Sequence, residues 1–285
     1  MRRNVELGEF LQSRRARLAP SDVGLASEGR RRAAGLRREE VARRAGISTE
    51  WYVKLEQGRV ISPSAETLAS LAEALMLSAV DEAHLRALAQ GGRQERFVRE
   101  AVPDVLRIVV EGLAEPAYLI GERWDILAWN TAAVQLFTDF GALPCEDRNI
   151  LAYMLLDPAA RELFGASWAA EAERMVSLFR ANYDLWAPDP AFLELVDRLH
   201  AGCPEFTAWW REHGVAAPVS GEKHLVHAGR GPLDYRYSTF KANDDPRLKL
   251  CIYVEKRQKC RLGHSDQPTP GVDSDRRETG ESPPT

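Results

Sequence analysis

The run Leu36–Gly58, LRREEVARRAGISTEWYVKLEQG, contains two helix-length segments that meet at a glycine. The small side chain of Ala42 allows two crossed helices to approach closely. Gly46 follows four residues later, and glycine tolerates the left-handed backbone with which many helices end. Ser48 can cap the next helix, and Glu50 lies in its first turn, where a carboxylate suits the positive end of the helix dipole. The run therefore predicts two short helices joined by a tight turn.

These two helices have an apolar side and a cationic side. The apolar positions are Val41, Ala45, Ile47, Tyr52 and Leu55, and the cationic positions are Arg37, Arg38, Arg43, Arg44 and Lys54. Crossed helices with this pattern share a core and leave the charges in solvent. Further apolar stripes at helical spacing occur within residues 7–18 and 68–75, and a last helix is expected over 81–89. Residues 1–92 are therefore expected to form a five-helix bundle.

Charge is distributed unevenly along the chain. The whole sequence has 38 Lys+Arg against 42 Asp+Glu, a net charge of −4, which by itself does not indicate a polyanionic partner. Residues 1–59, however, hold 14 basic and 8 acidic residues, whereas the remaining residues hold 24 and 34. A basic lobe joined to an acidic one is expected of a DNA-binding domain attached to a domain with another partner.

The N-terminal pattern closely resembles the lambda-repressor-like (Xre) helix-turn-helix domains, especially in the run GISTEWYVKLEQGR at residues 46–59. The resemblance implies that Thr49, Glu50 and Lys54 read base edges from the start of the second helix. It implies contacts with the DNA backbone for Arg37, Arg38, Ser48, Gln57 and Arg59. Trp51 packs either on the sugar-phosphate edge or on its own domain. A helical bundle that does not bind DNA is the alternative interpretation.

Proteins with a single such domain generally bind paired half-sites about one helical turn (~34 Å) apart. We therefore expect a homodimer on an inverted repeat of double-stranded DNA. The apolar stretch Val105–Leu113 is a candidate for the dimer surface, although such a stretch also suits a protein core.

The second part of the chain predicts an α+β domain over residues 105–258, after a linker at 93–104. Residues 105–113 have the pattern of an amphipathic helix, and 117–120 and 124–129 are strand-length runs followed by Asn130, a good helix cap. Helices are expected over 157–181 and 190–199, and strands over 233–241 and 248–255. This order predicts a mixed sheet covered by helices, which can enclose a small-molecule cavity.

The strand-turn-strand-cap-helix order resembles the opening of a PAS domain. Four segments, RWDILAWN, LLDPAAREL, CPEFTAWWREHGV and HLVHAGRGPLDYRYSTF, are similar in this order to the C-terminal domain of MmyB-like regulators. Those regulators join a repressor-type DNA-binding domain to a PAS-like ligand domain. The resemblance implies a one-component transcriptional regulator that holds a fatty-acid-like or other small apolar ligand. Ala228 stands where the family often has proline.

Aromatic side chains supply most of the apolar lining of such pockets. The candidates for this chain are Trp129, Tyr153, Phe164, Trp168, Phe206, Trp209 and Trp210, although ordinary core packing also explains most of them. A buried carboxylate head group needs charge-assisted donors, for which Arg161 and Arg180 are candidates. No cofactor other than this fatty-acid-like ligand is expected.

Three histidines, His213, His224 and His227, lie close together in the sequence, and the last two could present imidazoles to a metal. They are not part of an HExxH motif, and the chain has no nucleophile elbow, phosphate-cradling glycine loop or paired-carboxylate site. We therefore expect no enzyme and no metal site, and assign these histidines to turns near the sheet. Zinc binding is the alternative.

The four cysteines, Cys145, Cys203, Cys251 and Cys260, are widely spaced, as is usual for free thiols in a reducing cytoplasm. No run approaches the ~18 apolar residues that span a bilayer, so a cytoplasmic protein without membrane contact is expected. Residues 259–285 are poor in apolar side chains and predict a disordered tail. The competing class of function is a DNA-binding scaffold whose PAS-like domain only dimerises or binds proteins.

Overall fold

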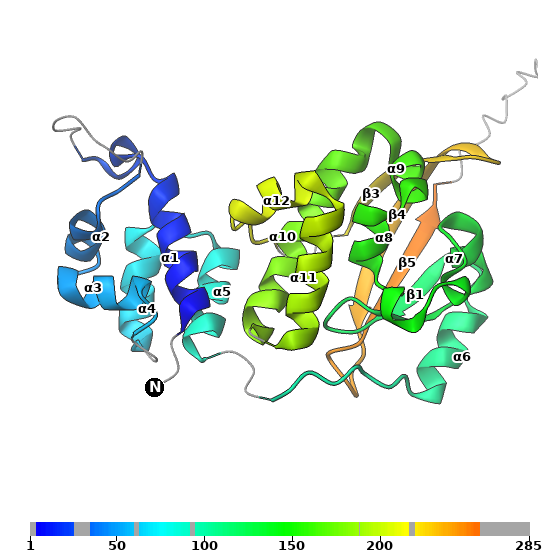
Figure 1. Cartoon of the computed structure of the whole chain (residues 1–285), viewed down its shortest axis with the longest axis horizontal. Helices are drawn as coiled ribbons and strands as arrows, with labels where there is room; N and C mark the ends of the chain where they lie inside the picture. The colour runs from blue at the N-terminus through cyan, green and yellow to red at the C-terminus, as the bar shows by residue number, and fades with distance from the viewer. Residues whose placement is uncertain are drawn as a thin grey trace, which may run out of the picture.

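In the computed structural model, the structure describes residues 4–25, 35–59, 63–91, 95–187, 189–216 and 220–256. The predicted tail at 259–285 and Cys260 lie outside these residues. The described chain contains two large hydrophobic cores, one formed by residues 7–89 and the other by residues 118–253. We call residues 4–91 the N-terminal lobe and residues 95–256 the C-terminal lobe (Figure 1).

The N-terminal lobe is a bundle of helices, in agreement with the prediction. The helices are α1 (Val5–Arg17), α2 (Arg38–Arg44), α3 (Thr49–Glu56), α4 (Ala65–Ala74) and α5 (Ala79–Ala89), with a short 3-10 turn at Pro20–Val23. Four of these helices begin at a side-chain cap: Asn4, Ser48, Ser64 and Ser78 each accept a hydrogen bond from a backbone N–H of the first turn. Local sequence therefore fixes where these helices start.

α1 approaches α3 unusually closely at Gly8. A Cβ atom at this position would lie 2.4 Å from the backbone oxygen of Glu56. Glycine is therefore needed for the two helices to pack at this distance. The sequence pattern did not reveal this contact, because Gly8 stands inside an otherwise ordinary helix.

The C-terminal lobe contains a five-stranded sheet in the order β2-β1-β5-β4-β3. The strands are β1 (Ala117–Ile120), β2 (Ile126–Trp129), β3 (Gly221–His227), β4 (Gly231–Lys241) and β5 (Lys249–Glu255). The α+β class is confirmed, but the sheet is not mixed as expected, since every pair of neighbouring strands is antiparallel. Three of the four pairs join consecutive strands by short turns that reverse the chain, and β5 runs antiparallel to β1.

Seven helices of the described chain belong to this lobe. They are α6 (Asp104–Gly112), α7 (Thr131–Leu136), α8 (Ile150–Leu156), α9 (Pro158–Phe164), α10 (Trp168–Trp186), α11 (Pro190–Gly202) and α12 (Pro204–Arg211), with short 3-10 turns at Phe140–Ala142, Cys145–Asp147 and Gly165–Ser167. Figure 1 shows α10, α11 and α12 between the sheet and the N-terminal lobe, with α6 on the far side of the sheet. As predicted, Asn130 caps α7 by accepting a hydrogen bond from the Ala133 N–H.

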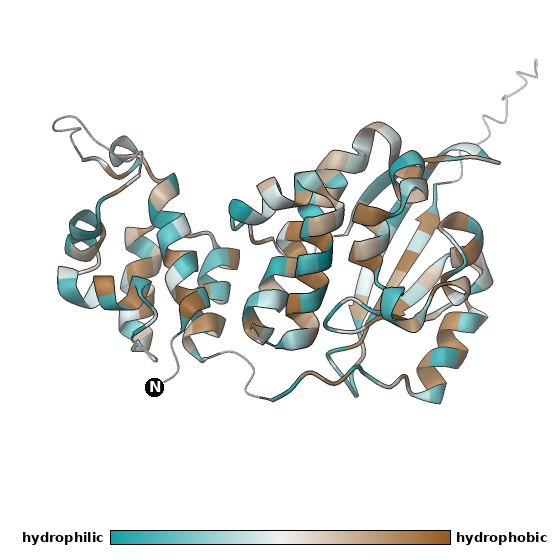
Figure 2. Cartoon of the chain, in the orientation of Figure 1, coloured by the Kyte–Doolittle hydropathy of each residue, from teal (hydrophilic) through white to brown (hydrophobic). Residues whose placement is uncertain are grey.

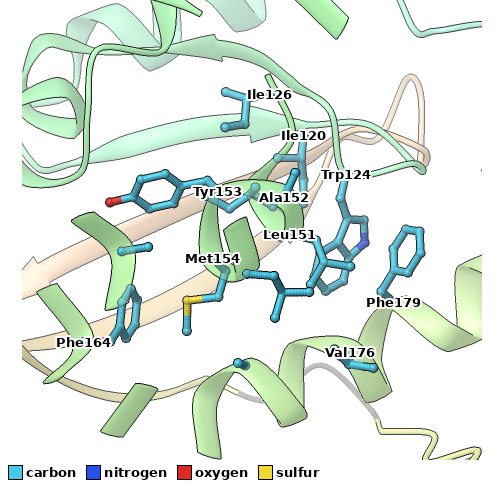
Figure 3. Packing of buried hydrophobic residues seen from close by; sticks show 14 of the residues in the cluster. Ile120, Trp124, Ile126, Leu151, Ala152, Tyr153, Met154, Phe164, Val176 and Phe179 are labelled. Atoms are coloured by element: carbon cyan, nitrogen blue, oxygen red, sulfur yellow. The ribbon is translucent and has the colours of Figure 1, made fainter. Parts of the chain in front are cut away.

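Three elements, α8, α12 and β3, were not predicted. α8 is buried at six of its seven positions and therefore has no polar side to give it a helical period. Figure 2 shows its ribbon as mostly hydrophobic, and Figure 3 shows its side chains packed between the sheet and α10. β3 alternates, but one of its inward positions is Lys223, so its hydrophobic pattern is incomplete.

No helix in the described part of the chain is long and apolar enough to cross a membrane.

Candidate DNA-binding surface and ligand cavity

The turn between α2 and α3 has the predicted geometry. Gly46 has φ = +66°, a left-handed backbone that ends α2. The Ser48 hydroxyl accepts a hydrogen bond from the Trp51 N–H and so caps α3. Ala42, Tyr52 and Leu55 are buried in the core that the two helices share. The helix-turn-helix is therefore held by one positive-φ glycine, one cap and a common apolar core.

The predicted base-reading residues Thr49, Glu50 and Lys54 are exposed on the outer side of α3. Figure 1 shows α2 and α3 on the side of the N-terminal lobe that faces away from the C-terminal lobe. The Lys54 ammonium lies 2.8 Å from the Glu50 carboxylate, and this ion pair lowers the pKa of Glu50. Two of the three side chains therefore neutralise each other on a surface that is open to a DNA groove.

A second ion-pair group fixes α3 to its neighbours. The Glu56 carboxylate is 1% exposed and lies 2.5 Å from Arg15 Nε of α1 and 2.6 Å from Arg38 Nε of α2. The Arg38 side chain is still 42% exposed. Arg38 thus joins the two helices of the motif at a position where phosphate contact was predicted.

The remaining predicted DNA contacts surround α3. Arg37 precedes α2, and its backbone N–H donates to Glu40 at 2.6 Å. Gln57 and Arg59 are exposed just after α3, whereas Trp51 is half-buried against the core of the N-terminal lobe. The predicted DNA-contacting residues thus lie on α2 and α3 or directly beside them. Their contacts with DNA stay predictions.

The C-terminal lobe contains a partly open apolar cavity of about 140 Å³ between the sheet and α10. The sheet contributes side chains from β1, β3, β4 and β5, and α10 forms the opposite wall. The lining residues are Tyr118, Ile120, Trp124, Ile150, Phe164, Arg174, Met175, Leu178, Ala181, Asn182, Ala216, Lys223, Tyr237, Thr239, Lys249, Cys251 and Tyr253. Most of this wall is apolar, as is typical of small-molecule sites.

Three cations line the cavity, and two of them share one carboxylate. Glu171 of α10 pairs with the Lys223 ammonium and lies 3.3 Å from Arg174 Nε. Both cations also lie over the ring of Tyr237, at 4.6 Å for Lys223 and 5.3 Å for Arg174. This end of the cavity therefore carries two positive charges and one negative charge.

Lys249, the first residue of β5, is the third cation. Within the described residues its ammonium has no hydrogen-bond or ion-pair partner, and burial together with the nearby Lys241 lowers its pKa. An ammonium group in an apolar wall is costly unless an anion accompanies it. Lys249 is therefore the cavity residue best suited to receive a negatively charged group.

The cavity wall also carries hydroxyl and thiol groups that are held in the protonated form. The hydroxyl oxygens of Tyr118 and Tyr253 lie 3.2 Å apart, and burial raises the pKa of both phenols. Burial also raises the pKa of the Cys251 thiol to about 12, so this cysteine is not a nucleophile. Cys251 is thus present in the cavity wall as a neutral thiol.

Of the predicted ligand-binding residues, Phe164 lines this cavity, whereas Trp129, Tyr153, Arg161 and Arg180 do not. Trp129 packs against Phe140 at the sheet end, and the Tyr153 hydroxyl donates to the Phe137 carbonyl within the core (Figure 3). Arg161 is on the surface, stacked on Trp168 and paired with Glu205, because α9 turns it outward. Arg180 lies on the face of α10 opposite the cavity.

Lys249, Lys223 and Arg174 were not predicted as ligand-binding residues. The alternation of β5 contained the missing signal, because Lys249 has the same parity as the inward residues Cys251 and Tyr253. The strand was predicted correctly, but the side chain of its first residue was not predicted to point into the cavity.

The three histidines have separate hydrogen-bond partners. His224 Nδ1 lies 2.6 Å from Asp234, His227 Nε2 donates to the Gln135 carbonyl, and His213 accepts a hydrogen bond from Arg180. Burial and the neighbouring Arg180 lower the pKa of His213 to about 4, so it is neutral at pH 7. His224 and His227 belong to β3 and not to turns, and the described residues contain no group of three or more His, Cys, Asp and Glu side chains that could hold a metal.

An exposed helix-turn-helix joined to a lobe with an apolar cavity is the arrangement of a DNA-binding transcription regulator with a ligand-binding domain. Residues 6–85 match the model of a helix-turn-helix domain, and residues 101–259 match the model of the MmyB-like transcription regulator ligand binding domain. The second match covers more than half of the chain, which therefore belongs to the MmyB-like transcription regulator family. No curated protein matches the chain. The matched families are regulator domains and not enzymes.

Proposed function

We propose that this protein is a sequence-specific, one-component regulator whose affinity for DNA changes when the cavity binds a small apolar ligand with an anionic head group, such as a fatty acid. The observation that carries the proposal is Lys249, a cation without an ion-pair partner among the described residues, in a largely apolar wall. A carboxylate there would gain a charge-assisted contact, and its hydrocarbon part would lie against the apolar lining.

The size of the cavity limits how a ligand can be accommodated. A cavity of ~150 Å³ is known to hold a molecule the size of benzene, so about 140 Å³ suits a short chain. A longer acyl chain would have to extend through the open side of the cavity or displace one of its walls. α10 is the wall formed by a single helix, whereas the opposite wall is a hydrogen-bonded sheet.

Native mass spectrometry of gently purified protein tests the ligand part of the proposal. We expect a bound species whose mass fits an amphiphile with an acidic head group. Protein without such a species, whose DNA affinity ignores added fatty acids, would instead support a scaffold that uses its C-terminal lobe only for dimerisation or protein binding.

Lys54→Ala is expected to weaken binding to the cognate duplex by about 1–3 kcal/mol and to leave binding to random duplex nearly unchanged. Arg38→Ala is expected to weaken both and to make the affinity less steep in salt, because a phosphate contact releases counterions. The cognate duplex would be selected from genomic fragments, and affinities measured by fluorescence anisotropy at several salt concentrations. Equal losses on both duplexes for Lys54→Ala would remove it from the base-reading residues.

A homodimer is part of the proposal, because one helix-turn-helix makes few base contacts. The outward side of α6 supports this, since Val105, Ile108 and Val109 are 59%, 68% and 44% exposed. The same side of the lobe includes the part of the sheet that α6 leaves uncovered, with Phe240 and Val254 at 55% and 49%. Exposed apolar area of this kind commonly marks an interface.

Ile108→Glu is expected to convert a dimer into a monomer. The dimer dissociation constant measured by analytical ultracentrifugation should be at least tenfold larger than that of wild type. Val98→Glu is the control, because Val98 is 72% exposed in the stretch before α6 and away from the helix surface. If the two variants associate equally well, α6 is not the dimer surface.

A further inference from the structure

A buried polar group joins the two lobes. His84 Nε2 of α5 lies 2.9 Å from the Asp184 carboxylate of α10, and the two side chains are 4% and 6% exposed. The other oxygen of the same carboxylate accepts from Arg180 Nε at 2.8 Å. Arg180 also donates to the Trp210 carbonyl and to His213 Nδ1. Buried charged groups with this many partners hold their elements in a defined position.

A second set of contacts runs from α1 to the chain after α12. Arg14 is 6% exposed, pairs with Asp81 at 2.7 Å, and donates to the His213 carbonyl at 2.9 Å. Arg17 donates to the Glu212 carbonyl. We call Arg14, His84, Arg180, Asp184 and His213 the interlobe clamp.

α10, which carries two of the five clamp residues, also forms a wall of the cavity. Arg174, Leu178 and Ala181 line the cavity, whereas Arg180 and Asp184 face the N-terminal lobe. An α-helix completes one turn every 3.6 residues, so residues three or four apart share a face. Arg174, Leu178 and Ala181 therefore lie on one face of α10, and Arg180 and Asp184 lie on the opposite face. A displacement of α10 away from the sheet therefore moves Asp184 and Arg180 against the N-terminal lobe.

The segment at 212–216 connects the same two places. Glu212 and His213 accept hydrogen bonds from α1, Val215 packs on the core of the N-terminal lobe, and Ala216 lines the cavity. The Ala216 N–H donates to the Ser177 carbonyl of α10 at 3.3 Å. Two neighbouring elements thus touch both the cavity and the DNA-binding lobe.

We propose that α10 transmits occupancy of the cavity to the DNA-binding lobe by opening the interlobe clamp. The proposal rests on the proposed function for the ligand, and it adds how the ligand acts. An occupant larger than the cavity pushes α10 outward, separates Asp184 from His84, and frees the N-terminal lobe to adopt other orientations. A ligand shifts such an equilibrium only by its difference in affinity for the two arrangements, so long occupants open the clamp and short ones do not.

A side chain built into the cavity tests the clamp without any ligand. Ala181→Phe adds a ring to the cavity wall of α10, and Ala181→Leu is a smaller step that preserves folding if the first variant does not. Hydrogen exchange of the full chain would be followed at α5. We expect the hydrogen-exchange protection of the backbone amides in α5 to fall at least tenfold, while the protection of the amides in α3 is unchanged. Unchanged α5 protection in a folded variant overturns the proposal.

A matched set of histidine variants tests the contact itself. His84→Leu removes the hydrogen-bond partner of Asp184, whereas His84→Gln offers an amide donor and should restore most of the α5 protection. His224→Leu is the control, because it breaks a comparable His–Asp pair that is exposed on β3. Equal α5 exchange in His84→Leu, His84→Gln and wild type means that the clamp does not hold the lobes.

A third experiment adds dodecanoate as the ligand probe and measures affinity for DNA. In wild type we expect it to change the affinity for the selected duplex by about tenfold, a typical coupling between two sites, and to have no further effect in His84→Leu. If dodecanoate affects both proteins equally, the clamp does not transmit binding, although ligand control stands. If dodecanoate affects neither, ligand control by this probe fails, and the Ala181 and His84 variants still decide whether α10 and the clamp are coupled.

Discussion

Gly8→Ala is expected to lower the free energy of unfolding of the N-terminal lobe by about 3 kcal/mol, because an added methyl group meets backbone that cannot turn aside. The new Cβ would lie 2.4 Å from the Glu56 oxygen and 2.9 Å from its carbonyl carbon. α1 must then move away from the C-terminal end of α3. Since α3 carries the predicted base-reading residues, affinity for the cognate duplex is expected to fall as well.

Denaturant unfolding of the full chain measures the loss of stability. Gly112→Ala is the control, since Gly112 lies at the end of α6 and a Cβ there would meet nothing within 4 Å. That variant is expected to be neutral or slightly more stable, because alanine favours helix over glycine by up to ~1 kcal/mol. Similar midpoints for the two variants would mean that α1 and α3 can separate at little cost.

Lys249→Met is expected to weaken the binding of dodecanoate by about tenfold to a hundredfold, since hydrogen bonds to charged groups contribute about 1.5–3 kcal/mol. Methionine keeps the length and apolar character of the side chain but removes its charge. Lys241→Met is the matched control, because Lys241 pairs with Lys249 across β4 and β5 but is exposed. Isothermal titration with dodecanoate and with the uncharged dodecanol separates the charge from the chain. Equal affinities of wild type and Lys249→Met for dodecanoate would exclude Lys249 as the anchor.

The same lysine gives the binding a dependence on pH. The carboxylate needs the ammonium form, and burial lowers the pKa of Lys249 below that of an ordinary lysine. Affinity for dodecanoate is therefore expected to decline as pH rises through this lowered pKa. The decline should begin at a lower pH than it would if the anchor were a solvent-exposed lysine. Affinity for dodecanol is expected to stay constant over the same range.

Local chemistry explains which elements could be predicted from the sequence. Ser48, Gly46 and Asn130 each act on the few residues next to them, and all three have the backbone or cap that was expected. The strands β4 and β5 were likewise close to their predicted positions, because their alternation reflects one buried face, and β1 was found as an apolar run of strand length. These features depend on neighbours in the chain.

The cavity could not be predicted in the same way, because its walls come from segments far apart in the sequence. Arg180 was a reasonable candidate for an anion site, but a shift of two residues around α10 decides whether a side chain faces the sheet or the N-terminal lobe. Lys249 was hidden because a lysine at a strand end usually lies in solvent. Antiparallel pairing was also missed, since the position of β5 beside β1 depends on the folded topology.

The ion pair between Glu50 and Lys54 has a consequence for how the protein would search a genome. Because the two charges cancel, the tip of α3 attracts random duplex only weakly, and the surrounding arginines supply the general attraction to phosphates. A base pair that offers an amino hydrogen to Glu50 and an acceptor to Lys54 can replace both halves of the pair at once. Sites lacking either group leave one partner unsatisfied, so dwell time on incorrect sequences is expected to be short.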